Sequence, residues 1–333
     1  MNALSTSRFD LPRLGACFCL PGDFASAEPW GSGHINDTFR ATWGENGDAR
    51  RYIHQRINDH VFPDPQAVMR NIAAVTGHVR AKLATAGTED LDRRVLTLVR
   101  SRDGADFHVD EEGHYWRTYL FVERSRSVDL MEGTEQAFKA GRAFGEFLVL
   151  LADYEGPRLV ETIRGFHDTP RRFANFVRAV EADPHGRAAG CRSEISALLA
   201  TEQKARAIAA LHDLGLLPER IVHNDTKLNN LLLDEQTGEP LCVIDLDTVM
   251  PGFALHDFGD LVRTGAARAT EDERDLRKVG VDESFYEALV RGFLSSAGPS
   301  LTKAEKEHLA LGAEIIVLEN ALRFLTDHLE GDV

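Results

Sequence analysis

Two polar stretches place carboxylates and an amide at spacings that suit metal and phosphate chemistry. Val222–Asn230 contains Asp225 and, five residues later, Asn230. Asp245 ends an apolar run twenty residues after Asp225. Carboxylate and amide oxygens are hard ligands for Mg²⁺, and a positioned carboxylate can take a proton from an alcohol. These three residues therefore predict phosphoryl transfer to a hydroxyl acceptor.

Further polar residues lie close to these three in the sequence. Lys227 stands two residues after Asp225, within reach of the oxygens of a transferring phosphoryl group. Side chains alternate along a strand, so Asp247 shares a face with Asp245 if the segment stays extended. Asp247 is therefore predicted to be either a second metal ligand or a residue that supports the first. His223 is expected to brace the loop by hydrogen bonds rather than to do chemistry.

A literal Asp257-Phe258-Gly259 also occurs, but the sequence argues against a metal-binding role for it. It lies thirty-two residues after Asp225, and no apolar strand leads into it. Asp257 and Asp260 are instead predicted to cap and brace the helix that follows them.

The N-terminal part of the chain has the pattern of strands around one helix. Residues 1–29 predict an irregular or short helical lead-in, and Trp30–Trp43 predict a glycine-containing turn between two strands. Asp64 and Pro65 predict the start of a helix, with apolar residues every three or four positions up to Gly87. Further strands are expected at Arg51–Ile57, Val95–Val99 and Tyr115–Glu123, and a hinge that meets an adenine ring is expected at Glu123–Asp129.

From Thr134 the pattern becomes helical and largely stays so. Gly141 and Gly145 lie on an apolar helix face, where they allow close contact with another helix. Thr302 and Glu305 have the spacing of a capping box, which predicts the start of a long helix through Leu325. The order of elements predicts an α+β, bilobal, protein-kinase-like fold. Residues 1–124 would form a small β-rich N-lobe with the glycine loop and a nucleotide-covering sheet; residues 125–333 would form a larger, mostly helical C-lobe with the catalytic loop and acceptor site.

Composition narrows the class of partner. The chain has 333 residues, 43% of them hydrophobic and 27% charged, which is ordinary for a globular protein. A formal charge of −15 argues against nucleic acid or an anionic membrane as the main partner. The four cysteines are scattered, and Cys17 and Cys19 alone cannot complete a zinc site. No run of about 18 apolar residues and no signal-peptide core is present, so the expected location is cytoplasmic.

The spacing from His223 through Asp225 to Asn230, together with Val243-Ile244-Asp245, resembles the aminoglycoside phosphotransferase/choline kinase superfamily. Six blocks look like the N-acetylhexosamine 1-kinase group: Gly33–Phe39, Gln55–Asn58, Val61–Pro65, His223–Asn230, Ile244–Gly252 and Arg323–Asp332. The resemblance implies ATP as donor and Mg²⁺ bridging its phosphates. The acceptor would be the anomeric hydroxyl of an N-acetylated hexose such as GlcNAc or GalNAc, and the product a sugar 1-phosphate.

The resemblance also implies roles for individual residues. Asp225 would be the catalytic carboxylate with Lys227 beside it, while Asn230, Asp245 and the ambiguous Asp247 are the metal candidates. The nucleotide is expected to contact the N-lobe at Gly31, Gly33, His34, Asn36, Thr38, Gln55 and Glu123. The sugar is expected to contact Asp225, with Arg323 and His167 as further candidates. The alternative for Arg323 is an ion pair with Asp327.

One departure from the protein-kinase pattern concerns the nucleotide phosphates. Gln55 stands where a protein kinase has a strand lysine, and the helix from Pro65 to Ala86 contains no Asp or Glu that could pair with one. We expect a neutral contact from Gln55, oriented by Asn71, to replace that ion pair. The alternative is that Gln55 faces solvent and Arg56 faces the cleft.

Other functions stay open at this point. A kinase of another small alcohol, of the choline, homoserine or aminoglycoside type, would use the same residues. A non-catalytic nucleotide binder of kinase fold is a different class, against which the intact Asp225, Asn230 and Asp245 argue. A metal-dependent hydrolase would need more closely spaced histidine ligands than His223 and His256 offer.

Overall fold

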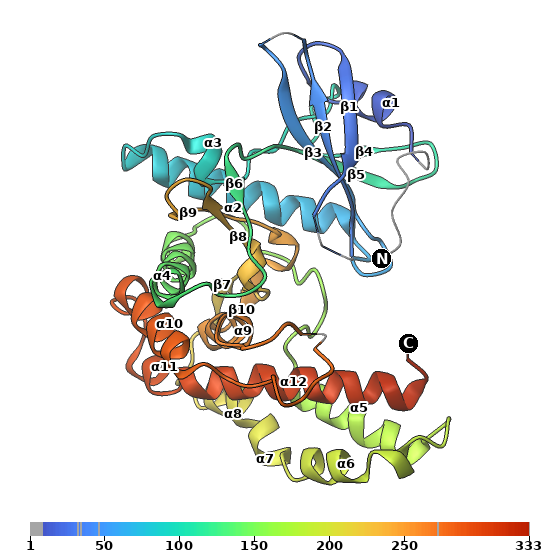
Figure 1. The fold of residues 1–333 in the computed structure, drawn as a ribbon, viewed down its shortest axis with the longest axis vertical. Coiled ribbons are helices and arrows are strands. Elements are labelled where there is room, and N and C mark those ends of the chain that lie inside the picture. The colour runs from blue at the N-terminus through green and yellow to red at the C-terminus, as the bar shows by residue number, and fades with distance from the viewer. Residues whose placement is uncertain (1–8, 32, 34, 46, 272, 333) are drawn as a thin grey trace. The chain divides into compact units, whose positions relative to one another are not determined.

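The computed structural model describes residues 9–31, 33, 35–45, 47–271 and 273–332, and its ribbon is drawn in Figure 1. The chain divides into two compact units. The first unit comprises the described residues up to Arg126 together with Tyr154–Ile163 and Leu232–Val249, so it takes two segments from beyond residue 125. The second comprises Ser127–Asp153, Arg164–Leu231 and the described residues from Met250 onward. Most of the strands lie in the first unit and most of the helices in the second, which confirms the predicted α+β class.

The first unit is built on a five-stranded antiparallel sheet. Its spatial order is β1 (Phe24–Pro29), β2 (Asp37–Trp43), β3 (Arg50–Arg56), β5 (Tyr115–Leu120) and β4 (His108–Val109). Since side chains alternate between faces, Phe39, Ala41 and Trp43 of β2 share one face, and they form a core with Leu11 and Leu14 of helix α1 (Leu11–Ala16). The opposite face is free to carry polar residues.

The same unit contains the predicted helix and a second, smaller sheet. In α2 (Pro65–Thr85), the Asp64 carboxylate accepts a hydrogen bond from the Ala67 N–H at 2.9 Å, as its capping position predicts. The predicted apolar stripe is buried, with Val68, Ile72 and Val75 fully enclosed. The remaining elements are α3 (Leu91–Arg94), the sheet β6–β8–β9 (Ser125–Arg126, Leu231–Asp234, Pro240–Val243) and the 3₁₀ turn η4 (Leu246–Thr248).

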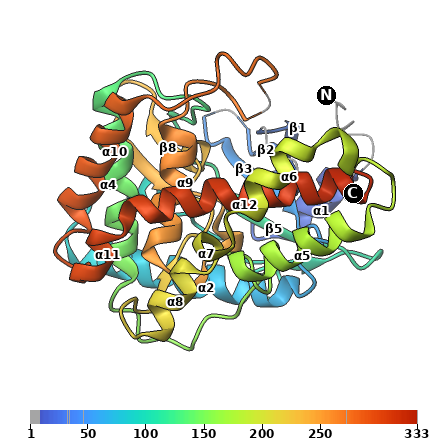
Figure 2. The same cartoon turned by 90° about the horizontal axis from the view of Figure 1, so that it is seen from below.

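The second unit is mainly helical. Its longer helices are α4 (Thr134–Leu151), α5 (Thr169–Ala182), α9 (Ala254–Gly265), α10 (Glu283–Ser296) and α12 (Leu309–Glu330). Shorter elements are η2 (Ala188–Gly190), α6 (Arg192–Leu199), α7 (Glu202–Ala205), α8 (Ala207–Asp213), β7 (Arg220–Val222), η3 (Leu228–Asn230), β10 (Met250–Gly252) and α11 (Lys303–Glu307). In Figure 2, α12 runs beside α5 and α9, with which it shares a core containing Ile315 and Leu322.

Helices α4 and α10 lie side by side in both ribbon views. Glycines permit this approach, as the sequence predicts for Gly141 and Gly145. A Cβ on Gly141 would lie 2.4 Å from the Leu289 carbonyl oxygen, and one on Gly292 would lie 2.0 Å from that of Phe138. No heavy atom fits at such distances, so these positions require glycine.

Three local predictions differ from the structure. Val95–Val99 forms one isolated bridge, Leu98 to Tyr119, instead of a strand, with the Val99 N–H donating to the Thr118 carbonyl oxygen at 2.8 Å. Helix α1 confirms the short helical part of the lead-in expected over residues 1–29, but Phe24–Pro29 at its end form strand β1. The Thr302 capping box is present, but the helix it starts ends after Glu307 and α12 begins afresh at Leu309. Within the described part of the chain, no helix has the length and apolar character needed to cross a bilayer.

Candidate active site

The predicted catalytic loop, His223–Asn230, follows β7 in the second unit and ends with the 3₁₀ turn η3. β7 pairs antiparallel with β10, which fixes the point where the loop begins. Asn224 has a left-handed backbone with φ of 64°. A residue with a Cβ keeps this conformation only where its surroundings hold it, so the loop depends on contacts with other elements.

Three of the predicted site residues meet in this loop. Lys227 Nζ lies 3.1 Å from Asp225 Oδ2. The Asn230 side-chain amide donates to Asp225 Oδ2 at 3.0 Å and to its backbone oxygen at 2.8 Å. The Asp225 side chain keeps 22% of its surface exposed. A reachable carboxylate with a cation beside it can accept a proton from an alcohol and offer positive charge to a phosphoryl group.

Helix α9 holds the loop in place through hydrogen bonds to its backbone and to the Thr226 hydroxyl. The buried Asp257 carboxylate accepts hydrogen bonds from the His223 N–H at 2.9 Å and the Asn224 N–H at 2.7 Å. The Thr226 hydroxyl donates to the Asp257 carbonyl oxygen, and the Leu228 N–H donates to the Thr264 hydroxyl at 3.3 Å. Burial raises the pKa of Asp257, although the two N–H groups oppose this shift. Asp257 therefore shapes the loop.

Asp260 lies one turn further along the same helix. Its Oδ1 accepts from Arg263 Nε at 2.9 Å, while Oδ2 is buried and has no partner among the residues that the structure describes. Burial raises the pKa of Asp260; Arg263 opposes the shift and the charge of Asp225 adds to it. The prediction that Asp257 and Asp260 cap the following helix is wrong, because both lie inside α9.

His167 ties the loop to the C-terminal helix. Its Nε2 lies 3.0 Å from the Asn224 carbonyl oxygen, and its Nδ1 lies 2.8 Å from Glu319 Oε2 on α12. His256 stacks against it, with ring centroids 4.6 Å apart, and burial lowers the pKa of His256 to about 3. Both nitrogens of His167 are engaged, so a sugar would have to displace one of these partners to bind it.

Arg323, the other candidate for sugar binding, is exposed on α12. Its guanidinium donates to Asn320 Oδ1 at 3.2 Å and lies 4.7 Å from the centre of the Phe324 ring. A planar cation over an aromatic ring at an exposed position keeps donors available for hydroxyl groups.

In the first unit, the segment with Asp245 and Asp247 does not stay extended. β9 ends at Val243, Asp245 has a left-handed backbone with φ of 60°, and a 3₁₀ turn follows. Asp245 is exposed, whereas Asp247 is 2% exposed. The two carboxylates therefore do not share the face of a strand. The exposed Asp245 has the oxygen chemistry that Mg²⁺ prefers.

Asp247 is paired with Arg117, a residue that the sequence analysis missed. Arg117 Nη2 donates to Asp247 Oδ2 at 3.0 Å, and Nη1 donates to Oδ1. The side chains are only 1% and 3% exposed. The available signal was an arginine between Trp116 and Thr118 in a largely buried strand, since a buried arginine requires a partner.

Gln55 is held by the same network. Its Oε1 accepts from Arg117 Nε at 3.0 Å, and its Nε2 donates to the Thr38 hydroxyl at 2.9 Å. Thr38, Gln55 and Arg117 are direct cross-strand neighbours in register on β2, β3 and β5. Asn71 does not orient Gln55, because its amide donates to the Val160 and Val249 carbonyl oxygens instead. Arg56, the alternative, is paired with Asp37.

The glycine loop joins β1 to β2. Gly31, with φ of 83°, and Gly33 are exposed and have open space where a Cβ would lie. His34 lies outside the described residues. Asn36, at the base of the loop, donates to Asp247 Oδ2 at 2.8 Å and accepts from the Asn58 N–H at 3.0 Å. The base of the loop is therefore anchored.

Glu123, predicted to contact the nucleotide, uses its side chain and its carbonyl group within the first unit. Its carboxylate takes two hydrogen bonds from Arg51, with Nε at 2.9 Å from Oε1. Its carbonyl oxygen accepts from Arg93 Nε at 3.0 Å. Any adenine contact made by Glu123 would compete with these partners or use its N–H.

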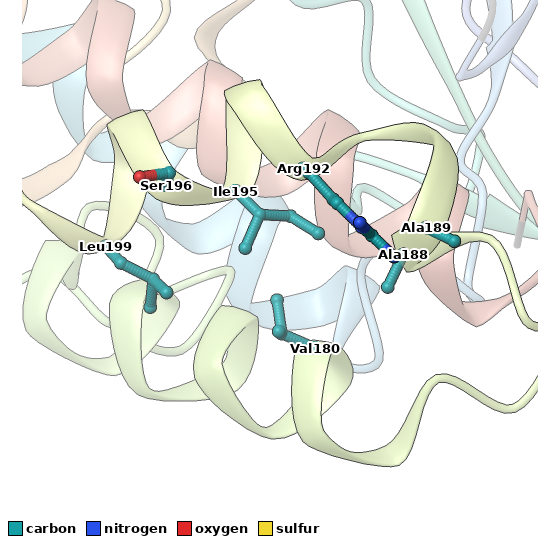
Figure 3. A pocket seen from close by; sticks show the side chains of 7 residues that line it. All are labelled: Val180, Ala188, Ala189, Arg192, Ile195, Ser196 and Leu199. Carbon is teal, nitrogen blue, oxygen red and sulfur yellow. The ribbon is translucent and has the colours of Figure 1, made fainter.

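A pocket of about 450 Å³ lies in the second unit between α5 and α6 (Figure 3). Its lining is mostly aliphatic, with one guanidinium and one hydroxyl; it consists of Val180, Ala188, Ala189, Arg192, Ile195, Ser196 and Leu199. None of the predicted site residues lines it. We therefore assign it no part in the chemistry.

Comparison with known proteins identifies the family of this chain. Residues 26–300 match the phosphotransferase enzyme family (APH). Because the match covers most of the chain, the protein belongs to this family of phosphotransferases.

Solved structures support the fold. A microcompartment-associated aminopropanol kinase is 18% identical with a TM-score of 0.58, covering 96% of this chain and 94% of that one. Aminoglycoside 2'-phosphotransferase-IIIa, solved with GDP, is 12% identical with a TM-score of 0.54, covering 100% and 93%. Choline kinase from Cryptosporidium parvum Iowa II is 13% identical with a TM-score of 0.53, covering 91% and 87%. These identities are too low to transfer a substrate.

Proposed function

We propose that the protein transfers the γ-phosphoryl group of ATP to the anomeric hydroxyl of an N-acetylated hexose. The observation that carries the proposal is the cluster of Asp225, Lys227 and Asn230 in the catalytic loop. Membership of the phosphotransferase family supports the reaction class. The choice of an N-acetylated sugar rests on the six sequence blocks that resemble N-acetylhexosamine 1-kinases.

In this proposal each group of the loop has one task. Asp225 orients the acceptor hydroxyl and takes its proton as the bond to phosphorus forms. The new O–P bond replaces the bond between the γ-phosphorus and the bridging oxygen, and ADP leaves. Lys227 stabilises negative charge on the transferring group. Arg323, whose donors are exposed, contacts sugar hydroxyls.

The donor set suits ATP with Mg²⁺. The exposed Asp245 carboxylate and the amide oxygen of Asn230 are proposed as metal ligands, and such hard oxygens fit Mg²⁺. When bound, the ion neutralises charge on the phosphates. Nucleotide contacts are proposed for the glycine loop and the sheet row beside it, namely Gly31, Gly33, His34, Asn36, Thr38 and Gln55, and for Glu123.

The test is ATP consumption against a panel of GlcNAc, GalNAc, glucose, choline and kanamycin. We expect turnover of an N-acetylated hexose and none of its methyl glycoside, in which the anomeric oxygen is blocked. Asp225→Asn should lower kcat by roughly 10²–10⁴-fold, the usual contribution of a general base, while the exposed Asp213→Asn serves as the control. Equal turnover of the methyl glycoside would refute transfer to the anomeric oxygen. Turnover of choline or kanamycin alone would identify a different alcohol as the acceptor.

A further inference from the structure

We propose that Asp247 is not a metal ligand but, with Arg117, a positioning pair that holds the turn presenting Asp245. This inference rests on the proposed function, in which Asp245 binds Mg²⁺. It concerns only residues of the first unit. It separates two aspartates that the sequence, Asp245-Leu246-Asp247, makes look equivalent.

The first argument is that the oxygens of Asp247 are already used. Oδ1 accepts from Arg117 Nη1, and Oδ2 accepts from Arg117 Nη2 at 3.0 Å and from Asn36 at 2.8 Å. The Asp247 side chain is 3% exposed. These hydrogen bonds occupy three of about four lone-pair positions of the carboxylate. Turning the side chain toward a metal would leave a buried guanidinium without its counter-charge, which is strongly unfavourable.

The second argument is that the backbone around Asp247 is fixed as well. The Thr162 hydroxyl donates to the Asp247 carbonyl oxygen at 2.7 Å. The Asn71 amide donates to the Val249 carbonyl oxygen at 3.1 Å. The turn is therefore held through one side chain and two main-chain oxygens.

The third argument is the backbone of Asp245 itself. Its φ of 60° lies in the left-handed region, which costs energy for a residue with a Cβ and persists where neighbouring contacts enforce it. Asp247, which is paired with Arg117, lies two residues after Asp245 in the sequence. It holds the end of the turn, so that Asp245 stays exposed while Asp247 stays buried.

Arg117 is a rigid anchor because the sheet holds it. Its Nε donates to Gln55 Oε1, and Gln55 in turn donates to Thr38 on the next strand. All three guanidinium nitrogens of Arg117 therefore make hydrogen bonds on two partners. The row links the central strands of the sheet to the turn.

A double-mutant cycle tests the proposal with Arg117→Met, Asp247→Asn and the two combined. The readout is the affinity for Mn²⁺ in the presence of a non-hydrolysable ATP analogue, measured by electron paramagnetic resonance, with kcat and KM for MgATP beside it. Loss of residues that orient a metal ligand usually lowers metal affinity by about 10–100-fold. We expect each single variant to lose Mn²⁺ affinity in this range and the double variant to lose no more than either single one.

A different pattern of Mn²⁺ affinities would overturn the proposed positioning pair. If Asp247 were a ligand, Asp247→Asn would weaken Mn²⁺ binding equally with and without Arg117, and Arg117→Met alone would leave the affinity unchanged. If Arg117→Met does not fold, Arg117→Lys keeps the charge but not the two-point contact, and wild-type Mn²⁺ affinity in that variant likewise contradicts the proposal. Arg80→Met, which breaks the Arg80–Asp92 pair of the same unit, is the control expected to bind Mn²⁺ normally.

Asp245→Asn separates this inference from the proposed function. Mn²⁺ affinity that is unchanged in Asp245→Asn would refute Asp245 as a ligand, and with it the metal site of the proposed function. Loss of affinity in Asp245→Asn with a normal Arg117→Met would refute only the positioning pair. The two failures are therefore distinguishable.

Discussion

Replacing His167 by alanine removes the side chain that joins the catalytic loop to helix α12. Its two ring nitrogens face the Asn224 carbonyl oxygen and the Glu319 carboxylate, at 3.0 and 2.8 Å. Both partners are hydrogen-bond acceptors, so both contacts are hydrogen bonds when both ring nitrogens donate, that is, when the ring is an imidazolium. The Glu319 side chain is 5% exposed. The variant therefore leaves a buried carboxylate whose remaining ion-pair partner is Arg172, with Nε 3.8 Å from Oε2.

The expected cost is large and depends on pH. Removing one partner of a buried ion pair costs about 3–5 kcal/mol, and Arg172, 3.8 Å from Glu319, offsets part of this cost. Burial lowers the pKa of His167, but the charge and hydrogen bond of Glu319 raise it more, so the folded-state pKa lies above the ordinary value of 6.5. A raised histidine pKa stabilises the fold fully below the unfolded-state pKa, and the contribution is lost as pH rises through the folded-state pKa. The difference between wild type and variant should thus be greatest near pH 6 and shrink toward pH 9.

Urea unfolding of both proteins at pH 6 and pH 9 measures this difference. His185→Ala is the control: His185 is exposed and makes one hydrogen bond, to the Glu330 carbonyl oxygen, so its loss should cost less than about 1 kcal/mol. A cost below about 1 kcal/mol for His167→Ala at pH 6 would refute the ion pair. A cost equal at both pH values would show that His167 is neutral.

Two further changes test the packing of the second unit. Asp257→Ala leaves two buried N–H groups of the catalytic loop unpaired, so the free energy of unfolding should fall by about 2–6 kcal/mol. The control is Asp282→Ala, which removes a half-buried N-cap that also accepts two N–H groups and should cost about 1 kcal/mol; equal losses in urea unfolding would contradict the bracing role. Gly292→Ala places a Cβ against the Phe138 carbonyl oxygen and should lower the melting temperature, whereas Gly77→Ala, exposed in α2 with open space around it, should stabilise by up to about 1 kcal/mol; a neutral Gly292→Ala would disprove the close approach of α4 and α10.

Elements whose causes are local could be predicted from the sequence. The start of α2 follows from Asp64 and Pro65, and the Thr302–Glu305 capping box is present as its spacing predicts. In both cases, a hydrogen bond between residues three positions apart determines where the helix begins. The break after Glu307 could not be predicted in this way, because α12 packs on α5 and α9, which lie far away in the sequence.

In the candidate site, too, local contacts could be predicted from the sequence and contacts between distant residues could not. The spacing of Asp225, Lys227 and Asn230 places all three in one loop, and the structure brings them together. The partners that hold such loops are distant in the chain: Arg117 and Asp247 are 130 residues apart, and His167 and Glu319 are 152 apart. No spacing rule connects them, and only the fold shows which acidic residues are paired.

Each unit repeats one solution to the same physical problem. A carboxylate that must meet substrate or metal has to be exposed and yet held at one angle. In the second unit, Asp225 follows the left-handed Asn224, and the buried Asp257 binds the backbone of that turn. In the first, the left-handed Asp245 is itself exposed, and the buried Asp247 holds the turn through Arg117. The proposed roles therefore divide by burial rather than by spacing: the accessible Asp225 and Asp245 are proposed for the chemistry, and the buried Asp257 and Asp247 for holding the two turns.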